Sequence, residues 1–196
     1  GELGLDIEIR IAHNIDDLFN MLNRGEGDLI AYGLTITKPR KEIVSFTHHH
    51  YVTHQALVQR KPPDWQSIPD YKLDKYLISN VIDLMDDTVH VRKNSSYYHR
   101  LQNLAQELGG PIYIEEVSGE MPTDEIIEMV VDGKIKYTVA DYNIASINKA
   151  YYPILHIETP VSLAQRMAWA VRKNSPELLT TVNEWIKSIK EDDLYY

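Results

Sequence analysis

The sequence predicts an α/β fold with two similar lobes. Short apolar segments alternate with segments whose apolar residues recur at helical spacing, and this alternation runs twice along the chain. The segments "NMLNRGEGDLIAYG" and "EMVVDGKIKYTVAD" share one form, in which a helix, a stopping glycine and a short spacer precede a buried strand. Strands that alternate with helices form parallel or mixed sheets with helices on both faces. Two such runs therefore predict two lobes, each with its own sheet.

Composition restricts the function classes. The chain has 196 residues, enough for two small lobes with cores of their own. Its 20 basic and 29 acidic side chains leave a formal charge of -9, whereas nucleic acids and anionic membranes attract basic patches. No run of 18 apolar residues is present, so we expect no membrane span. The absence of Cys excludes disulfides, thiolate metal sites and a Cys nucleophile.

The first run begins with a strand and a helix. Residues Leu5 to Ile11 alternate apolar and polar side chains, which predicts a strand. Asn14 then caps a helix that carries acidic residues in its first turn and ends at Gly25. The apolar stretch Asp28 to Gly33 predicts a buried strand. The polar stretch Thr35 to Arg40 predicts a loop that enters a short helix.

A strand is predicted over His54 to Gln59, and Pro62-Pro63 marks a loop after it. The second run then repeats the alternation. We expect strands at Val89 to Val91, Ile112 to Val117 and Tyr137 to Asp141, and helices capped by Ser95 and Ser96, by Thr123 and by Ser175. The stretch Met167 to Val171 is apolar. Glycines end the first two of these helices.

The carboxyl ends of two predicted strands indicate where a ligand binds. In open α/β sheets, ligands lie beyond the carboxyl ends of the strands, so Thr35 to Arg40 and Asp141 to Asn143 predict a site in a cleft between the lobes. The guanidinium of Arg40 can hold a carboxylate through two parallel hydrogen bonds, or it is a solvated Arg at a helix start. Asp141 can pair with a ligand ammonium, or it caps the helix that follows.

A helix start supplies a third candidate contact. The backbone N–H groups that follow Ser95 and Ser96 can hold an anion, although plain capping by these serines is the alternative. Thr35 and Thr37 offer hydroxyls near Arg40. A cation, an anion and a helix start together fit a small zwitterion, such as an amino acid or a short peptide.

Metal and enzyme motifs are weak. His48, His49, His50 and His54 suggest metal ligation, but consecutive side chains of an extended segment point to opposite faces and cannot converge on one ion. The sequence contains no GxSxG, HExxH, P-loop or Gly-rich dinucleotide turn, and its paired acids have no context that would raise a carboxyl pKa. We therefore expect no catalytic residue, no metal site and no cofactor.

Four segments resemble the type II periplasmic solute-binding family, in particular its amino-acid-binding branch. They are "DLIAYGLTITKPRKEIVSFT", "VHVRKNSSYYHRLQNL", "YTVADYNIA" and "AWAVRKNSPELLTTVNEWI", and they occur in the family's order over nearly the whole chain. The last three are most similar to the amino-terminal regulatory domains of the membrane-bound lytic transglycosylase F family.

The resemblance implies roles for particular residues. Arg40 would be the arginine that grips the ligand carboxylate, Thr35 its hydroxyl partner, and Gly33 would lie in the same ligand-binding segment. Asp141 would bind the ligand ammonium. Ser95 and Ser96 would stand at the helix start that closes over the carboxylate.

The resemblance also implies a two-lobed, venus-flytrap domain organisation. Lobe one would comprise residues 1–56 and 170–196, lobe two residues 57–169, and the hinge would lie near 56–57 and 166–170. The family has a further strand and helix before the segment that corresponds to "GELGLDIEI", so we expect lobe one to lack them. The expected location is the periplasm, with attachment to the outer membrane through a longer protein.

Four functional hypotheses follow. The first is a non-catalytic sensor that binds an amino acid or a peptidoglycan-derived peptide and regulates an appended lytic transglycosylase domain outside this chain. The second is a free-standing amino-acid receptor of an ABC-type transporter. The third is an enzyme on the same fold, such as a small-acid dehydratase, which would need a further acid or base in the cleft. The fourth is a metal receptor built on the histidines.

Overall fold

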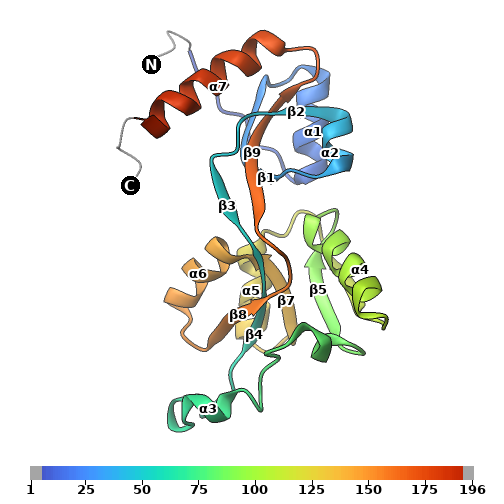
Figure 1. Ribbon diagram of the computed structural model, residues 1–196, viewed down its shortest axis with the longest axis vertical. Coiled ribbons are helices and arrows are strands. Elements are labelled where there is room, and N and C mark those ends of the chain that lie inside the picture. The colour runs from blue at the N-terminus through green and yellow to red at the C-terminus, as the bar shows by residue number, and fades with distance from the viewer. Residues whose placement is uncertain (1–5, 192–196) are drawn as a thin grey trace. The chain divides into compact units, whose positions relative to one another are not determined.

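The computed structural model describes residues 6–191, which form two compact units (Figure 1). Unit 1 is made of the chain up to His50 and from Ala168 on, and unit 2 is Tyr51–Met167. The chain therefore passes from one unit to the other twice. Each unit combines a sheet with helices, so the predicted α/β fold with two units is confirmed. The placement of the hinge near 56–57 and 166–170 stays a prediction.

Unit 1 carries a sheet in the order β1-β9-β2. Its elements are α1 (Ile15–Arg24), β1 (Leu29–Thr35), α2 (Lys38–Ile43), β2 (Val44–Phe46), the end of β9 (Gln165–Arg172) and α7 (Pro176–Glu191). Strands β2 and β9 are antiparallel, with Ser45 opposite Val171. The core of this unit packs α1 against the sheet through Phe19, Leu22 and Leu34. Helix α1 begins at the cap Asn14, whose side chain accepts a hydrogen bond from the Asp17 N–H, as predicted.

Unit 2 carries a five-stranded mixed sheet in the order β6-β5-β7-β4-β8. Its elements are β3 (Tyr51–Thr53), β4 (Gln55–Arg60), the 3₁₀ turn η1 (Trp65–Ser67), α3 (Asp70–Leu73), the 3₁₀ turn η2 (Val81–Leu84), β5 (Thr88–Arg92), α4 (Ser96–Leu108), β6 (Tyr113–Val117), α5 (Thr123–Val131), β7 (Tyr137–Asp141), α6 (Tyr142–Tyr151) and β8 (Leu155–Pro160). Strand β5 is parallel to β6 and β7, whereas β4 is antiparallel to β7 and β8. The short strand β3 pairs with the start of β9.

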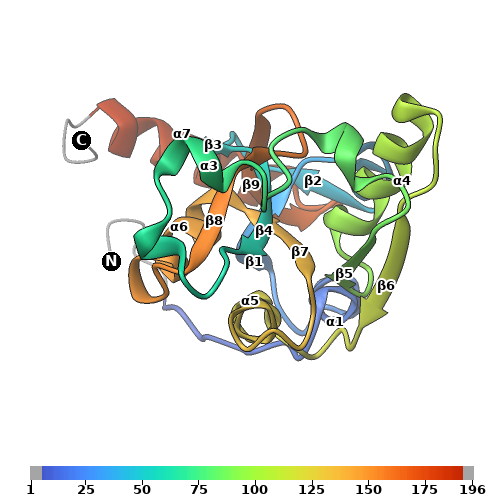
Figure 2. The same ribbon diagram turned by 90° about the horizontal axis from the view of Figure 1, so that it is seen from below.

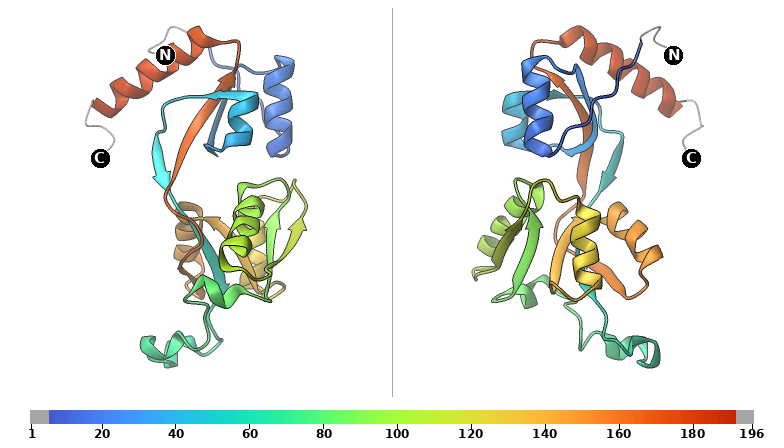
Figure 3. Two further views of the ribbon diagram at one scale, coloured as in Figure 1. Left: turned by 45° about the vertical axis from the view of Figure 1, so that its right-hand side comes forward. Right: turned by 180° about the vertical axis from the view of Figure 1, so that it is seen from behind.

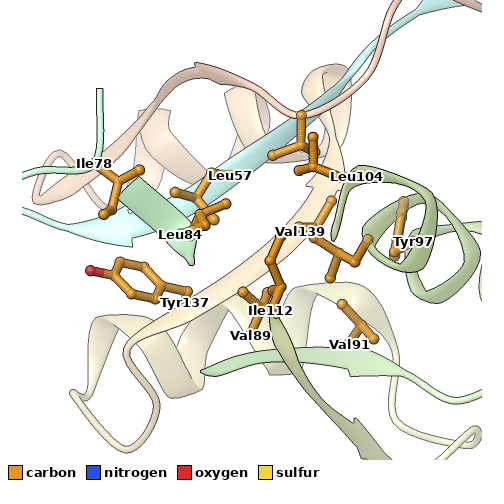
Figure 4. Packing of buried hydrophobic residues seen from close by; sticks show 12 residues of the cluster. Leu57, Ile78, Leu84, Val89, Val91, Tyr97, Leu104, Ile112, Tyr137 and Val139 are labelled. Atoms are coloured by element: carbon orange, nitrogen blue, oxygen red, sulfur yellow. The ribbon is translucent and has the colours of Figure 1, made fainter. Parts of the chain in front are cut away.

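Both faces of the unit 2 sheet are covered. On one face, Leu101 and Leu104 of α4 pack with Leu57, Val89 and Val139 (Figure 4). The next residues along β4 and β7 point to the opposite face, because side chains alternate along a strand. There α5 and α6 cover the sheet, as the two views of Figure 3 and the end-on view of α5 in Figure 2 show. A sheet buried on both faces explains the continuous apolar runs of its central strands.

A buried amide fastens the long connection between β4 and β5. The Gln59 side chain donates a 2.7 Å hydrogen bond to the Ile78 carbonyl oxygen and accepts a 2.8 Å bond from the Ile78 N–H. Thr159 of β8 donates a second bond of 2.6 Å to the same carbonyl. Gln59 is 2% exposed, so the free energy of these bonds is not lost to competition with water.

One predicted strand is wrong. Residues 6–12 form no strand in the described part of the chain, and Leu5 lies outside it. The alternation has the period of two that is typical of a strand, but a strand also requires a neighbour to pair with, and residues 6–191 supply none. Ile7, Ile9 and Ile11 are consequently exposed rather than buried.

Other differences are smaller. The strands β2, β3 and β8 were not predicted, because two of them have three residues each and β8 ends in a proline. Thr123 is the first residue of α5 rather than its cap, a role taken by Pro122. Among the described residues, no helix combines the length and apolar character that a membrane crossing requires.

Replacing Gln59 by Leu is expected to lower the free energy of unfolding by about 1–3 kcal/mol, although Leu is the more apolar residue. The Ile78 N–H would remain buried without its acceptor. Urea unfolding followed by circular dichroism measures the change. Gln102→Leu, at an exposed position of α4, is the matched control and should change stability by less than about 0.5 kcal/mol. Equal stabilities of the two variants would contradict the anchoring role of Gln59.

Candidate functional site

The predicted site residues fall into two groups, one in each unit. Gly33, Thr35 and Arg40 belong to unit 1, and Ser95, Ser96 and Asp141 belong to unit 2. Each group is built by its own strand ends and helix starts.

The unit 1 group lies where β1 ends and α2 begins. Thr35, the last residue of β1, is buried, and Gly33 lies two positions earlier on the same side of the strand. Thr37 caps α2, because its side chain accepts a hydrogen bond of 3.4 Å from the Arg40 N–H. Arg40 is thus in the first turn of the short helix into which the stretch Thr35 to Arg40 was predicted to lead. The sequence Thr-Lys-Pro starts a helix because Thr is a good cap and Pro fits the first turn.

Two contacts fix the position of the Arg40 guanidinium. Its Nη1 donates a 3.1 Å hydrogen bond to the Thr35 carbonyl oxygen at the end of β1. Its ζ carbon lies 5.7 Å from the centre of the Phe19 ring, within the range of a cation–π contact. The charge is therefore held at the carboxyl end of a strand by the core of its own unit. A guanidinium held in this way can bind a carboxylate at a small cost in side-chain entropy.

The unit 2 group is centred on the side chain of Gln55. Gln55 opens β4, lies opposite Asp141 in the sheet and is fully buried. Its Nε2 donates hydrogen bonds of 3.1 Å to the Ser96 Oγ at the start of α4 and of 3.1 Å to the Gln165 Oε1 on β9. One amide therefore joins two strands and a helix start.

Asp141 lies at the end of β7, as predicted, and is 7% exposed. Its backbone N–H donates a 3.2 Å hydrogen bond to the Tyr97 hydroxyl of α4. Asp141 precedes α6, but its carboxylate makes no capping hydrogen bond to that helix. Ser95 precedes α4 and likewise makes no side-chain cap. The capping interpretation of these two side chains is therefore not supported.

The charges of the unit 2 group suit both ends of a zwitterion. Asp141 contributes a carboxylate, while the 13-residue helix α4 presents its N-terminus at Ser96, where the helix dipole favours an anion. Gln55 links these two positions, since it lies opposite Asp141 and bonds Ser96. Among the described residues, Gln55 Oε1 and Ser95 Oγ are buried without a hydrogen-bond partner, and buried polar atoms normally have one.

Sequence reasoning missed Gln55, Tyr97 and Gln165. A signal for Gln55 exists in hindsight, because this Gln directly precedes the apolar run Ala56 to Val58, and burying its amide costs free energy unless it is hydrogen-bonded. Nothing in the sequence distinguishes Gln165 or the hydroxyl of Tyr97 from ordinary surface residues. The pairing of β4 with β7 is what brings these side chains to Asp141.

The histidines make other contacts. The His48 N–H donates to Asn183 Oδ1 at 2.6 Å, and the His54 ring stacks at 4.6 Å on the aromatic residue that begins α6. The His50 ring lies 5.3 Å from the Trp169 ring, and burial lowers the pKa of His50 below its usual value. Within residues 6–191, no three His, Asp or Glu side chains gather closely enough to hold a metal ion.

Comparison with known proteins gives one family. The family model described as bacterial extracellular solute-binding proteins, family 3, matches residues 1–196. A curated relative, membrane-bound lytic murein transglycosylase F of Desulfosudis oleivorans, is 34% identical over 195 residues, which are 100% of this chain and 40% of that protein. The chain thus spans well under half the length of this relative.

Solved structures share the fold. An ancestral arginine-binding protein bound to arginine superposes with a TM-score of 0.79 at 23% identity, over 99% of this chain and 79% of the other. The substrate-binding protein of an amino acid ABC transporter superposes with a TM-score of 0.76 at 23% identity, over 97% and 77% of the two chains. At these identities the likeness establishes the fold.

Replacing Thr37 by Ala is expected to lower the free energy of unfolding by about 1 kcal/mol, because α2 loses its cap. Thr37→Ser keeps the hydroxyl, so its urea midpoint of unfolding should be close to that of the unchanged chain. Urea unfolding of the two variants side by side makes the comparison. If Ala and Ser variants unfold together, the cap does not hold the start of α2.

Proposed function

The chain belongs to the bacterial extracellular solute-binding proteins, family 3, and from this premise we propose that it binds a small zwitterion, an amino acid or a short peptide, without catalysing a reaction on it. The observation that carries the proposal is the polar group around Gln55. It combines a buried carboxylate, Asp141, with the N-terminus of α4, and the Gln55 Oε1 and Ser95 Oγ atoms beside them are buried without a hydrogen-bond partner among the described residues.

Each ligand group has a proposed partner. Arg40, whose position is fixed by Thr35 and Phe19, binds the ligand carboxylate through its guanidinium. Asp141 binds the ammonium. Ser95 and Ser96 add contacts to the carboxylate at the start of α4.

The carboxyl end of β1 contributes the remaining two residues of the proposed site. Thr35 is buried and its carbonyl holds the Arg40 guanidinium, while Gly33 leaves the backbone open to a ligand because it has no side chain. Arginine is bound by one of the structural neighbours, which makes it a reasonable first ligand to test.

The curated relative suggests a role for ligand binding. The name of the curated relative and its greater length lead us to propose that this domain regulates a lytic transglycosylase domain of a longer protein in the periplasm, attached to the outer membrane. A ligand can regulate only if it binds one conformation of the domain more tightly than another. Peptides released from peptidoglycan are the ligands that would report on the substrate of such an enzyme.

A second candidate function is delivery of an amino acid to a transporter. The structural likeness to the binding protein of an amino acid ABC transporter favours it. The two functions share the ligand site and differ in the protein that receives the signal.

Thermal unfolding with a panel of free amino acids and peptidoglycan-derived peptides tests the ligand class. A ligand at a hundred times its dissociation constant adds about 2.7 kcal/mol and should raise the midpoint by about 5–10 °C. Arg40→Ala and Asp141→Asn should each abolish the shift. Lys41→Ala, which removes an exposed cation from the same helix, is the control and should retain it.

Ligands in which the ammonium or the carboxylate is blocked test the contribution of each charge to binding. The N-acetyl derivative of the active amino acid lacks the ammonium, and its amide lacks the carboxylate, so both should bind far more weakly than the parent. A midpoint shift that survives in Arg40→Ala, or that is the same for the blocked and free ligands, would contradict the zwitterion site.

Regulation requires a separate measurement on a longer protein that carries this domain. The rate of glycan cleavage should change when the active ligand is added, and the change should disappear in Arg40→Ala. An unchanged rate, with ligand binding intact, would remove the regulatory proposal and leave the transport receptor.

A further inference from the structure

A β-bulge in β8 turns two polar side chains toward the same face of the unit 2 sheet. Across the pairing of β4 with β8, Leu57 lies opposite Thr159 and Gln59 lies opposite His156, so the register shifts by one residue between these two pairs. Side chains alternate along a regular strand, and two residues three positions apart would then point to opposite faces. The bulge instead places both Thr159 and His156 on the face that carries Gln59.

Two of these side chains reach Ile78, in the middle of residues 61–87, the connection between β4 and β5. The Ile78 side chain packs in the core with Leu57 and Leu84 (Figure 4). The helical elements of this connection, η1, α3 and η2, have three, four and four residues. Helices this short are not stable alone, so the connection depends on its contacts with the sheet.

The backbone of Ile78 fixes the orientation of the Gln59 amide. The Ile78 carbonyl accepts a hydrogen bond of 2.7 Å from Gln59 Nε2, and the Ile78 N–H donates one of 2.8 Å to Gln59 Oε1. A flipped amide would set donor against donor and acceptor against acceptor at both positions. The amide nitrogen has a second N–H to donate, and it lies 3.3 Å from Nδ1 of the His156 ring.

The orientation of the amide in turn fixes the protonation of His156. A hydrogen bond from Gln59 requires a lone pair on His156 Nδ1, so the imidazole is neutral and carries its hydrogen on Nε2. A proton on Nδ1 would place two donors against each other, and the amide cannot turn without losing both bonds to Ile78. His156 therefore takes up a proton only by giving up its contact with Gln59.

The surroundings of His156 favour the neutral ring. Burial of this half-buried side chain lowers the pKa of the imidazole below its usual value. Among the charged groups that face it, Glu158 of β8 and Asp74 after α3 raise the pKa, whereas Lys149 of α6 and Lys61 after β4 lower it. Glu158 forms an ion pair with Lys149, so part of its negative charge is balanced.

We propose that His156, Gln59 and Ile78 form an acid-sensitive latch, in which protonation of His156 loosens the hold of the sheet on residues 61–87. The latched state excludes the proton, whereas a released or unfolded state takes it up with the usual pKa of about 6.5. The stabilisation by the latch is therefore complete above about pH 7 and is lost as the pH falls through 6.5 toward the lower pKa of the latched ring. The proposal does not depend on the ligand site.

Hydrogen exchange of the Ile78 N–H, followed by nuclear magnetic resonance, tests the latch where it acts. Between about pH 7.5 and about pH 5, the protection factor of this N–H should fall by roughly three- to tenfold, the factor that one hydrogen bond of ordinary net strength contributes. In His156→Asn the side-chain oxygen can accept from Gln59 but cannot be protonated, so the fall should be absent. His99→Asn, which removes an exposed histidine of α4, is the matched control and should retain the fall.

Nitrogen-15 shifts of the His156 ring provide a test that needs no variant. At neutral pH the unchanged chain should have Nδ1 without hydrogen and Nε2 with one, and the ring should titrate with a midpoint below the usual value of about 6.5. A hydrogen on Nδ1 at neutral pH, a midpoint at or above the usual value, or the same fall in Ile78 protection in His156→Asn and the unchanged chain would each overturn the proposal.

Discussion

The side-chain amide of Gln55 is the interaction on which the polar end of unit 2 depends. A fully buried amide is costly unless it is hydrogen-bonded, and the Gln55 Nε2 meets this requirement by donating to Ser96 of α4 and Gln165 of β9, whereas its Oε1 has no partner among the described residues. Since Gln55 also lies opposite Asp141, the same residue is a neighbour of both the end of β7 and the start of α4. The candidate site is thus a consequence of how β4 enters the sheet, rather than a set of residues added to a finished fold.

In unit 1 a charged side chain is positioned by contacts of a different kind. Its cation, the Arg40 guanidinium, is positioned by the Thr35 backbone carbonyl and by the Phe19 ring. In unit 2 the Asp141 backbone N–H bonds the Tyr97 hydroxyl, and the Gln55 amide bonds Ser96 at the start of α4. Unit 1 thus positions a cation and unit 2 an anion, each at the end of a strand, and these are the two charges that the proposed zwitterionic ligand would need.

Much of this architecture is encoded locally. The cap Asn14 and the stop Gly25, which takes a positive φ of 77°, fix α1 from short-range chemistry alone, and the apolar run that ends at Asp141 fixes β7. The features that the sequence predicted wrongly or not at all depend on residues that are distant in the sequence. The alternation at Ile7 to Ile11 has the period of a strand but no neighbouring strand within residues 6–191, and the position of Gln55 beside Asp141 depends on the pairing of β4 with β7. A single sequence contains the period of a strand and not the identity of its partner.

The measurement that tests this account most directly is a nuclear magnetic resonance titration that observes the glutamine side-chain amides. Gln55 and Gln59 lie on the same strand and are both buried, but Gln55 bonds the candidate site whereas Gln59 bonds the Ile78 backbone. If the site is centred on Gln55, a bound amino acid should shift the Gln55 amide signals and leave those of Gln59 in place. Saturation with ligand that leaves the Gln55 signals unchanged would contradict the account.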